Sequence, residues 1–182
     1  NFAGRHRNLL ELFGARATEM EGAFDPHAVF TASQRQLVGA YFLHEYAFEA
    51  SALFNPSIVR HPDQTGMRDG RCRFVLSLRA VGEGHISSIA FREGVASPDG
   101  SFTLWPETPF AIAATPDAHD GEGGPVNVKK HESSPLSGVV IFPITRAQRN
   151  GLEDLRLVQF TEDDGSKYYT GTYTAYSGRE VG

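Results

Sequence analysis

The sequence is poor in cysteine, in long apolar stretches and in excess positive charge, and each shortage argues against certain partners or cellular compartments. Cys72 is the only cysteine, so no disulfide forms within the chain, which suits a reducing, cytoplasmic compartment. No apolar run approaches the length of a membrane-spanning helix, so we expect no membrane partner. The net charge of −5 argues against nucleic acid and against an anionic membrane surface.

Metal-ligand patterns are also scarce. His61 and Asp63 lie two residues apart, but no second pair with ligand spacing accompanies them, so we predict no metal site and no cofactor. What the sequence does contain is ordinary for a globular protein. Its 182 residues, of which 40% are hydrophobic, are enough to bury a core.

The first part of the chain, residues 1–52, indicates helices. Apolar residues from Leu9 onward recur at helical spacing. Ser33 followed by Gln36 has the form of a capping box, in which each side chain bonds to the backbone of the other residue. This box predicts a second helix that runs to about Ala52. We expect this helical segment either to pack on the rest of the protein or to mediate assembly into a homo-oligomer.

From residue 53 onward the pattern changes to short strands separated by turns that contain glycine or proline. Four strands are predicted in succession: Leu53–Val59, Arg73–Val81, His85–Phe91 and Phe102–Trp105. Antiparallel neighbours in this order form a meander, which is the form of one blade of a β-propeller. Pro56 has no amide hydrogen for a central ladder, so the first strand is expected to be irregular or at an edge.

A β-hairpin follows a long loop. Residues 106–136 are punctuated by prolines and are predicted to be a loop, and Val139–Phe142 is predicted to be a short buried strand. The arms of the hairpin are Leu155–Phe160 and Lys167–Tyr176. Its turn contains Asp164-Gly165, a pair that supplies the positive φ angles of a tight turn. The residues at the mouth of this hairpin are therefore held on ordered backbone.

Charged side chains gather where the first arm of the hairpin begins. A period of two puts Asp154 and Arg156 on one face of the strand and Glu153 on the opposite face. The residues alone leave two interpretations open. Asp154 and Arg156 form either a structural ion pair or an acid beside a guanidinium at a cleft.

Two upstream positions leave similar alternatives open. Asn55 and Ser57 flank a proline, and they suit either a turn or a pair of ligands for hydroxyl groups. Arg79 lies near the end of its strand. It suits either a rim ion pair with Glu83 or the binding of a sugar hydroxyl, because a guanidinium offers several donors in a fixed fork.

Three motifs in order resemble a known family. They are Phe54-Asn55-Pro56-Ser57-Ile58, then the strand and turn from Phe74 to Gly84, then Gly151-Leu152-Glu153-Asp154-Leu155-Arg156 with the Tyr- and Thr-rich arm that ends at Tyr176. Across residues 53–176 they resemble glycoside hydrolase family 130, the β-mannoside phosphorylases and related mannosidases.

The resemblance implies a mainly β fold, a five-bladed β-propeller. By the count of strands, residues 53–182 supply about two blades of its catalytic domain, preceded by the N-terminal α-helices. We therefore expect the sequence to be the N-terminal portion of a longer enzyme whose C-terminal blades follow. On this interpretation residues 1–182 alone have no useful turnover and expose unpaired sheet edges.

The resemblance also implies the chemistry. Asp154 is the expected proton donor, and the proton passes through a sugar hydroxyl. The residues expected to bind the mannoside are Asn55, Ser57, Arg79, Glu153 and Arg156. The expected partners are a β-mannoside oligosaccharide and inorganic phosphate, which is the co-substrate of an inverting phosphorylase that forms mannose 1-phosphate. Two alternatives stay open: a β-mannoside hydrolase of the same family, and a non-catalytic carbohydrate-binding propeller.

Overall fold

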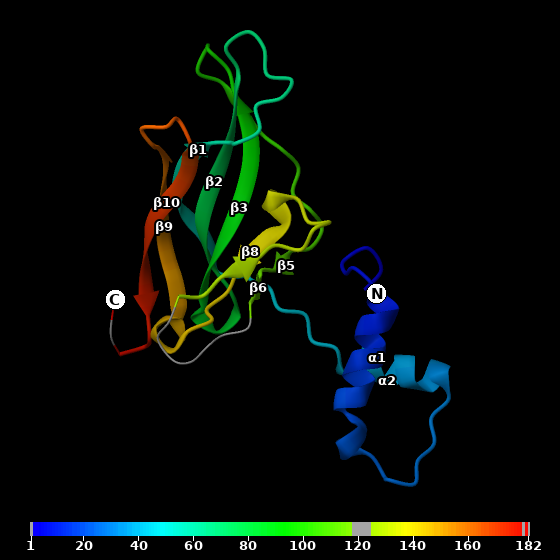
Figure 1. Ribbon diagram of the computed structural model, residues 1–182. Coiled ribbons are helices and arrows are strands. Elements are labelled where there is room, and N and C mark those ends of the chain that lie inside the picture. The colour runs from blue at the N-terminus through cyan, green and yellow to red at the C-terminus, as the bar shows by residue number, and fades with distance from the viewer. Residues whose placement is uncertain (1, 118–124, 180, 182) are drawn as a thin grey trace. The chain divides into compact units, whose positions relative to one another are not determined.

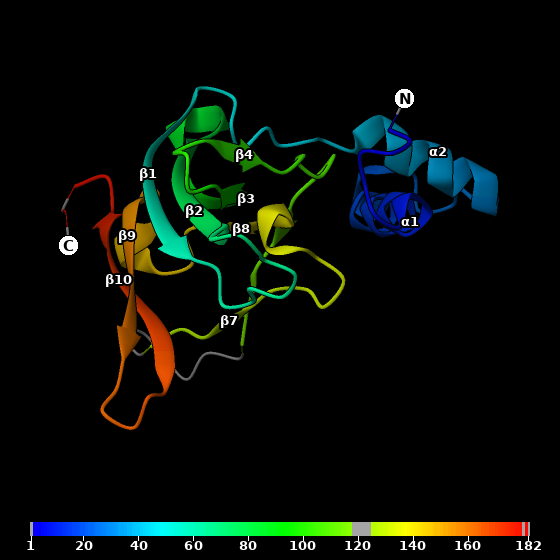
Figure 2. The same ribbon diagram turned by 90° about the horizontal axis from the view of Figure 1, so that it is seen from above.

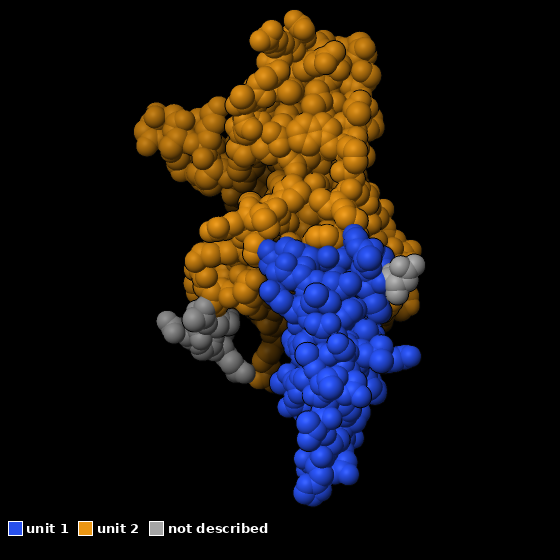
Figure 3. All heavy atoms as spheres, turned by 90° about the vertical axis from the view of Figure 1, so that its right-hand side faces the viewer, with its two compact units in different colours: residues 1–46 blue, residues 47–182 orange. Residues whose placement is uncertain are grey.

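The structure of the protein is a computed structural model that describes residues 2–117, 125–179 and 181. It is mainly β, with two α-helices. The chain divides into two compact units, residues 1–46 and residues 47–182, which Figure 3 colours separately. None of the helices in the described residues is long and apolar enough to cross a membrane.

The first unit is a pair of helices, α1 (Leu9–Glu19) and α2 (Ala32–Phe42), with a 3-10 turn, η1 (Glu21–Ala23), after α1 (Figure 1). The helix predicted from Leu9 onward is confirmed. Gly39 of α2 lies against the backbone of α1: a Cβ at this position would be 1.9 Å from the carbonyl oxygen of Phe13. Only a residue without a side chain permits the two backbones to approach so closely.

The boundaries of α2 differ from the prediction. Thr31, not Ser33, is the N-cap: its hydroxyl accepts a hydrogen bond from the Gln34 amide, and the Gln34 side chain accepts one from the Thr31 amide. The sequence contains two overlapping capping boxes, and the earlier one starts the helix. The helix ends at Phe42, well short of residue 52, and the Glu45 carboxylate beyond it is held in ion pairs by the first residues of the chain.

The second unit is built on an antiparallel meander of four strands, which Figures 1 and 2 show from two directions. Each strand pairs with the next in the chain: β1 (Ala52–Arg60), β2 (Cys72–Val81), β3 (Ser87–Ala96) and β4 (Phe102–Leu104). The meander predicted from the sequence is therefore confirmed. The chain between β2 and β3 turns through η2 (Glu83–His85).

The second edge of β3 is shared by three other strands. β4 pairs with its C-terminal end, β8 (Val139–Ile141) pairs with its middle, and the start of β9 meets it at a single parallel bridge between Ser87 and Gly151. Short elements occupy the described part of the predicted loop and the segment after it: β5 (Ile112–Ala113), β6 (Thr115–Pro116), β7 (Val128–Lys129), η3 (Leu136–Gly138) and η4 (Arg146–Gln148). β5 is parallel to β8, and β6 pairs with β7.

The predicted hairpin is also confirmed. β9 (Gly151–Thr161) and β10 (Lys167–Tyr176) pair in antiparallel fashion, and Gly165 in their turn has φ +83°. β9 packs against the first three strands of the meander. The core between them consists of these buried side chains: Val59, Val75, Ile89, Phe91, Ala114, Val139 and Leu152.

Candidate functional site

Two β-bulges lie against each other where β9 packs on β1. In β1 two residues, Asn55 and Pro56, lie opposite a single residue of β2. In β9 two residues, Asp154 and Leu155, lie opposite a single residue of β10. The irregularity expected at Pro56 is therefore present, because a bulge is a place where a strand tolerates a proline.

The first residue of each bulge has a left-handed backbone. Asn55 has φ 51° and Asp154 has φ 54°. Residues other than glycine rarely adopt this conformation, although Asn and Asp tolerate it best. The two side chains meet: Nδ2 of Asn55 donates a hydrogen bond of 2.8 Å to Oδ1 of Asp154. The strained residues of the two bulges are thus joined to each other, and backbone strain of this kind is concentrated at functional sites.

Arg79 of β2 contacts the carboxylates of two adjacent residues of β9, Glu153 and the bulge residue Asp154. Its Nη2 atom lies 2.6 Å from Oε1 of Glu153, and its Nη1 atom lies 3.9 Å from Oδ1 of Asp154. Its Nε atom donates to Ser87 Oγ at 3.0 Å, and its guanidinium carbon lies 5.2 Å from the centre of the Phe54 ring. The sequence left open a rim ion pair with Glu83; the ion pairs described for Arg79 are with Glu153 and Asp154.

The remaining predicted residues also lie at this junction. Ser57 Oγ accepts a hydrogen bond of 3.0 Å from the Leu157 amide, which ties β1 to β9. Nη1 of Arg156 donates a hydrogen bond of 2.8 Å to the carbonyl oxygen of Pro56, and this bond ties Arg156 to the bulge in β1. All six predicted site residues are therefore brought together, although Ser57 and Arg156 bind backbone atoms.

The predicted faces of β9 are wrong. The sequence placed Glu153 opposite Asp154, yet both carboxylates reach the same guanidinium, that of Arg79. The cause is the extra residue of the bulge, which interrupts the alternation of side chains. Leu152 and Leu155 consequently both turn to the apolar side, three residues apart.

Ser87 is a member of the cluster that the sequence did not reveal. It is 1% exposed, accepts from Arg79, and lies 3.4 Å from Oε1 of Glu153. It also forms the bridge to Gly151, where a Cβ would lie 2.9 Å from the Cβ of Ser87. A serine at the start of a strand carries no signal of this role, because the partner strand is more than sixty residues away.

The carboxylates of Glu153 and Asp154 differ in their exposure and in their hydrogen-bond partners. Oε1 of Glu153 is used by Arg79 and Ser87, and this side chain is 19% exposed. Asp154 is 36% exposed, and its Oδ2 atom accepts no hydrogen bond from the described residues. Asp154 is therefore the carboxylate that a ligand can reach, while Glu153 fixes Arg79 beside it. A reachable carboxylate next to a fixed guanidinium offers a polar ligand an acceptor and a donor side by side.

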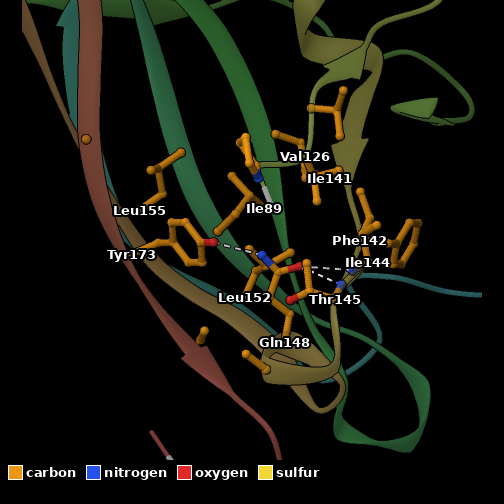
Figure 4. Close-up of a pocket in the computed structure, with 15 residues that line it drawn as sticks. Ile89, Val126, Ile141, Phe142, Ile144, Thr145, Gln148, Leu152, Leu155 and Tyr173 are labelled. Carbon is orange, nitrogen blue, oxygen red and sulfur yellow. Dashed lines mark hydrogen bonds between the residues drawn. The ribbon is translucent and has the colours of Figure 1, made fainter. Parts of the chain in front are cut away.

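β9 also borders an apolar cavity of about 440 Å³, drawn in Figure 4. Leu152, Leu155 and Tyr173 of the hairpin line one side of it, and residues of β8 and the segment that follows line the other. The polar cluster and the cavity thus both border β9, through different side chains of that strand.

The described residues contain no group of three or more His, Cys, Asp or Glu side chains that could hold a metal ion. His61 instead lies beside a buried carboxylate, with Nε2 3.3 Å from Oε1 of Glu93. Comparison of the chain with protein-family models, with curated proteins and with solved structures found no match.

Proposed function

We propose that the protein is a carbohydrate-active enzyme that acts on β-mannosides, with Asp154 as its proton donor. The observation that carries the proposal is the bond between the two strained bulge residues, Asn55 and Asp154. It holds a reachable carboxylate in a costly backbone conformation, and Arg79 lies beside it. Strained residues of this kind are concentrated where the position of a side chain matters for function.

The proposed reaction is inverting phosphorolysis. Asp154 supplies a proton, through a hydroxyl of the bound sugar, to the oxygen of the leaving group, and phosphate attacks the anomeric carbon from the opposite face to give mannose 1-phosphate. Asn55 and Arg79 orient the sugar and the acid. Arg79 and Arg156 are both engaged, with Glu153 and with the Pro56 carbonyl, so cationic groups outside this cluster bind the phosphate.

The proposal also assigns the strands to the blades of a β-propeller. The meander β1–β4 corresponds to one blade of a β-propeller, and the β9–β10 hairpin corresponds to the start of a second. In this arrangement the bulges lie where two neighbouring blades meet, and a site between blades draws its residues from distant parts of the sequence.

The test uses the protein and a panel of β-linked mannobioses, with and without inorganic phosphate. We expect α-mannose 1-phosphate to form only when phosphate is present. Asp154→Asn should abolish this product, while Asp164→Asn, on the turn of the same hairpin, should leave it unchanged. Phosphate-dependent turnover that survives Asp154→Asn would refute the assignment of the acid.

Two alternatives give different results in the same assay. A β-mannoside hydrolase releases free mannose at the same rate without phosphate, and it still depends on Asp154. A non-catalytic carbohydrate-binding protein gives no product with any substrate. It retains its affinity for mannobiose when Asp154 is replaced by Asn, and calorimetry measures that affinity directly.

A further inference from the structure

The cavity behind the bulge in β9 has the size and composition of a ligand site. Its volume of about 440 Å³ lies within the range of small-molecule pockets. Figure 4 shows Ile89 of β3 between the two walls, with Leu155 and Tyr173 on one side and Ile141 and Ile144 on the other.

The described part of the lining disfavours charged ligands. The described residues that line the cavity are aliphatic or aromatic apart from Thr145, Gln148 and Tyr173, and none of them is charged. A charged ligand would lose its hydration without gaining a partner, which is costly in an apolar site. The cavity therefore favours a neutral molecule.

One hydrogen-bond donor, the hydroxyl of Tyr173, belongs to a residue that lines the cavity. Oε1 of Gln148 accepts from the amides of Ile144 at 3.0 Å and Thr145 at 3.1 Å, which fixes the orientation of its side-chain amide. The NH₂ group must then face Tyr173, whose hydroxyl oxygen accepts from it at 2.8 Å. The phenolic proton of Tyr173 is not used by this bond and has no acceptor among the described residues.

We propose that this cavity binds a neutral, largely apolar small molecule whose one hydrogen-bond acceptor meets the hydroxyl of Tyr173. The proposal does not depend on the action of Asp154, because no residue of the polar cluster lines the cavity. Its ligand class also differs from a sugar, which carries many hydroxyl groups that this lining would leave unpaired.

The test is titration of the 182-residue chain with prodan, a neutral naphthalene ketone whose emission shifts to the blue in apolar surroundings. We expect saturable binding to a single site. Tyr173→Phe should weaken it about fivefold, the value of one hydrogen bond. The matched control is Tyr168→Phe, on the same strand and equally exposed at 44% but outside the cavity, which should leave the affinity unchanged.

Two variants fill the cavity from different sides, so that a folding defect in one does not decide the result. Ala175→Leu on β10 and Ala147→Leu on η4 should each abolish the saturable signal, with circular dichroism confirming that the variant is folded. The proposal is overturned if the wild type shows no saturable binding. It is equally overturned if folded Leu variants bind as the wild type does, or if Tyr173→Phe and Tyr168→Phe are alike, since the probe then binds exposed apolar surface elsewhere.

Discussion

The left-handed backbone at Asp154 leads to a prediction about the stability of variants, and this prediction does not depend on any activity. Asp154→Gly and Asp154→Ala both remove the carboxylate and its bond to Asn55, so the comparison of the two variants isolates the backbone. In an ordinary strand position alanine is the more stable by about 0.5–1 kcal/mol, because glycine loses more freedom on folding. At φ 54° the order should reverse.

The size of the reversal follows from two opposing terms. An alanine forced into the left-handed region costs about 1–2 kcal/mol, and glycine avoids that cost. After subtraction of about 0.5–1 kcal/mol for the flexibility of glycine, Asp154→Gly should be the more stable by about 0.5–1 kcal/mol. With a urea dependence of about 2 kcal/mol per molar, the unfolding midpoint should differ by about 0.3–0.5 M.

The assay is urea unfolding followed by circular dichroism, and the control is Val158 in the same strand. Val158 is exposed and has no positive φ, so Val158→Ala should be more stable than Val158→Gly. If Asp154→Ala is as stable as Asp154→Gly or more so, the left-handed bulge does not exist in solution. The strain argument for the site then fails with it.

Two further predictions concern charge. Glu93→Gln should destabilise the chain by about 3 kcal/mol in urea unfolding, because it removes the buried partner of Arg73 and His61; a change below about 1 kcal/mol would refute this. The Ser166 hydroxyl, and then the Ser166 amide, hold the pKa of Asp164 below its ordinary value of 3.8. Because the pKa of Asp164 is lower in the folded state than in the unfolded state, its ionisation stabilises the fold at pH values above 3.8. This stabilisation is lost as the pH falls through the pKa of the folded state. Ser166→Ala should thus raise this pKa in an NMR titration and lower stability at neutral pH but not well below pH 3.8; an unchanged pKa would contradict the prediction.

The sequence predicted the strands well because their signals are local. The alternation in β2, the prolines and glycines between strands, and the Asp164-Gly165 turn each act within a few residues. The end of α2 was missed because Glu45 is bound by residues about forty positions earlier, at the start of the chain, and no local pattern reports such a contact.

Contacts between distant residues also limited the prediction of the site. The motifs indicated all six residues, but the faces assigned to Glu153 and Asp154 were wrong because a bulge changes the alternation by one residue. A signal for the bulge existed: Asn55 and Asp154 are residue types that strands disfavour. The cavity had no such signal, because its walls come from segments as far apart as Ile89 and Tyr173 and are apolar like any core.

The bonds that build the polar cluster have a consequence for how the protein is made. Asn55 and Asp154 are 99 residues apart, and Arg79 and Glu153 are 74 apart. At a synthesis rate of about 5–20 residues per second, Glu153 is added about 4–15 seconds after Arg79, and the sheet that carries Arg79 is uncovered during that interval. The meander pairs locally in that interval, whereas the cluster needs the hairpin to dock. The acid is therefore added to a sheet already in place, and any partner that covers this face too early competes with the chain's own β9.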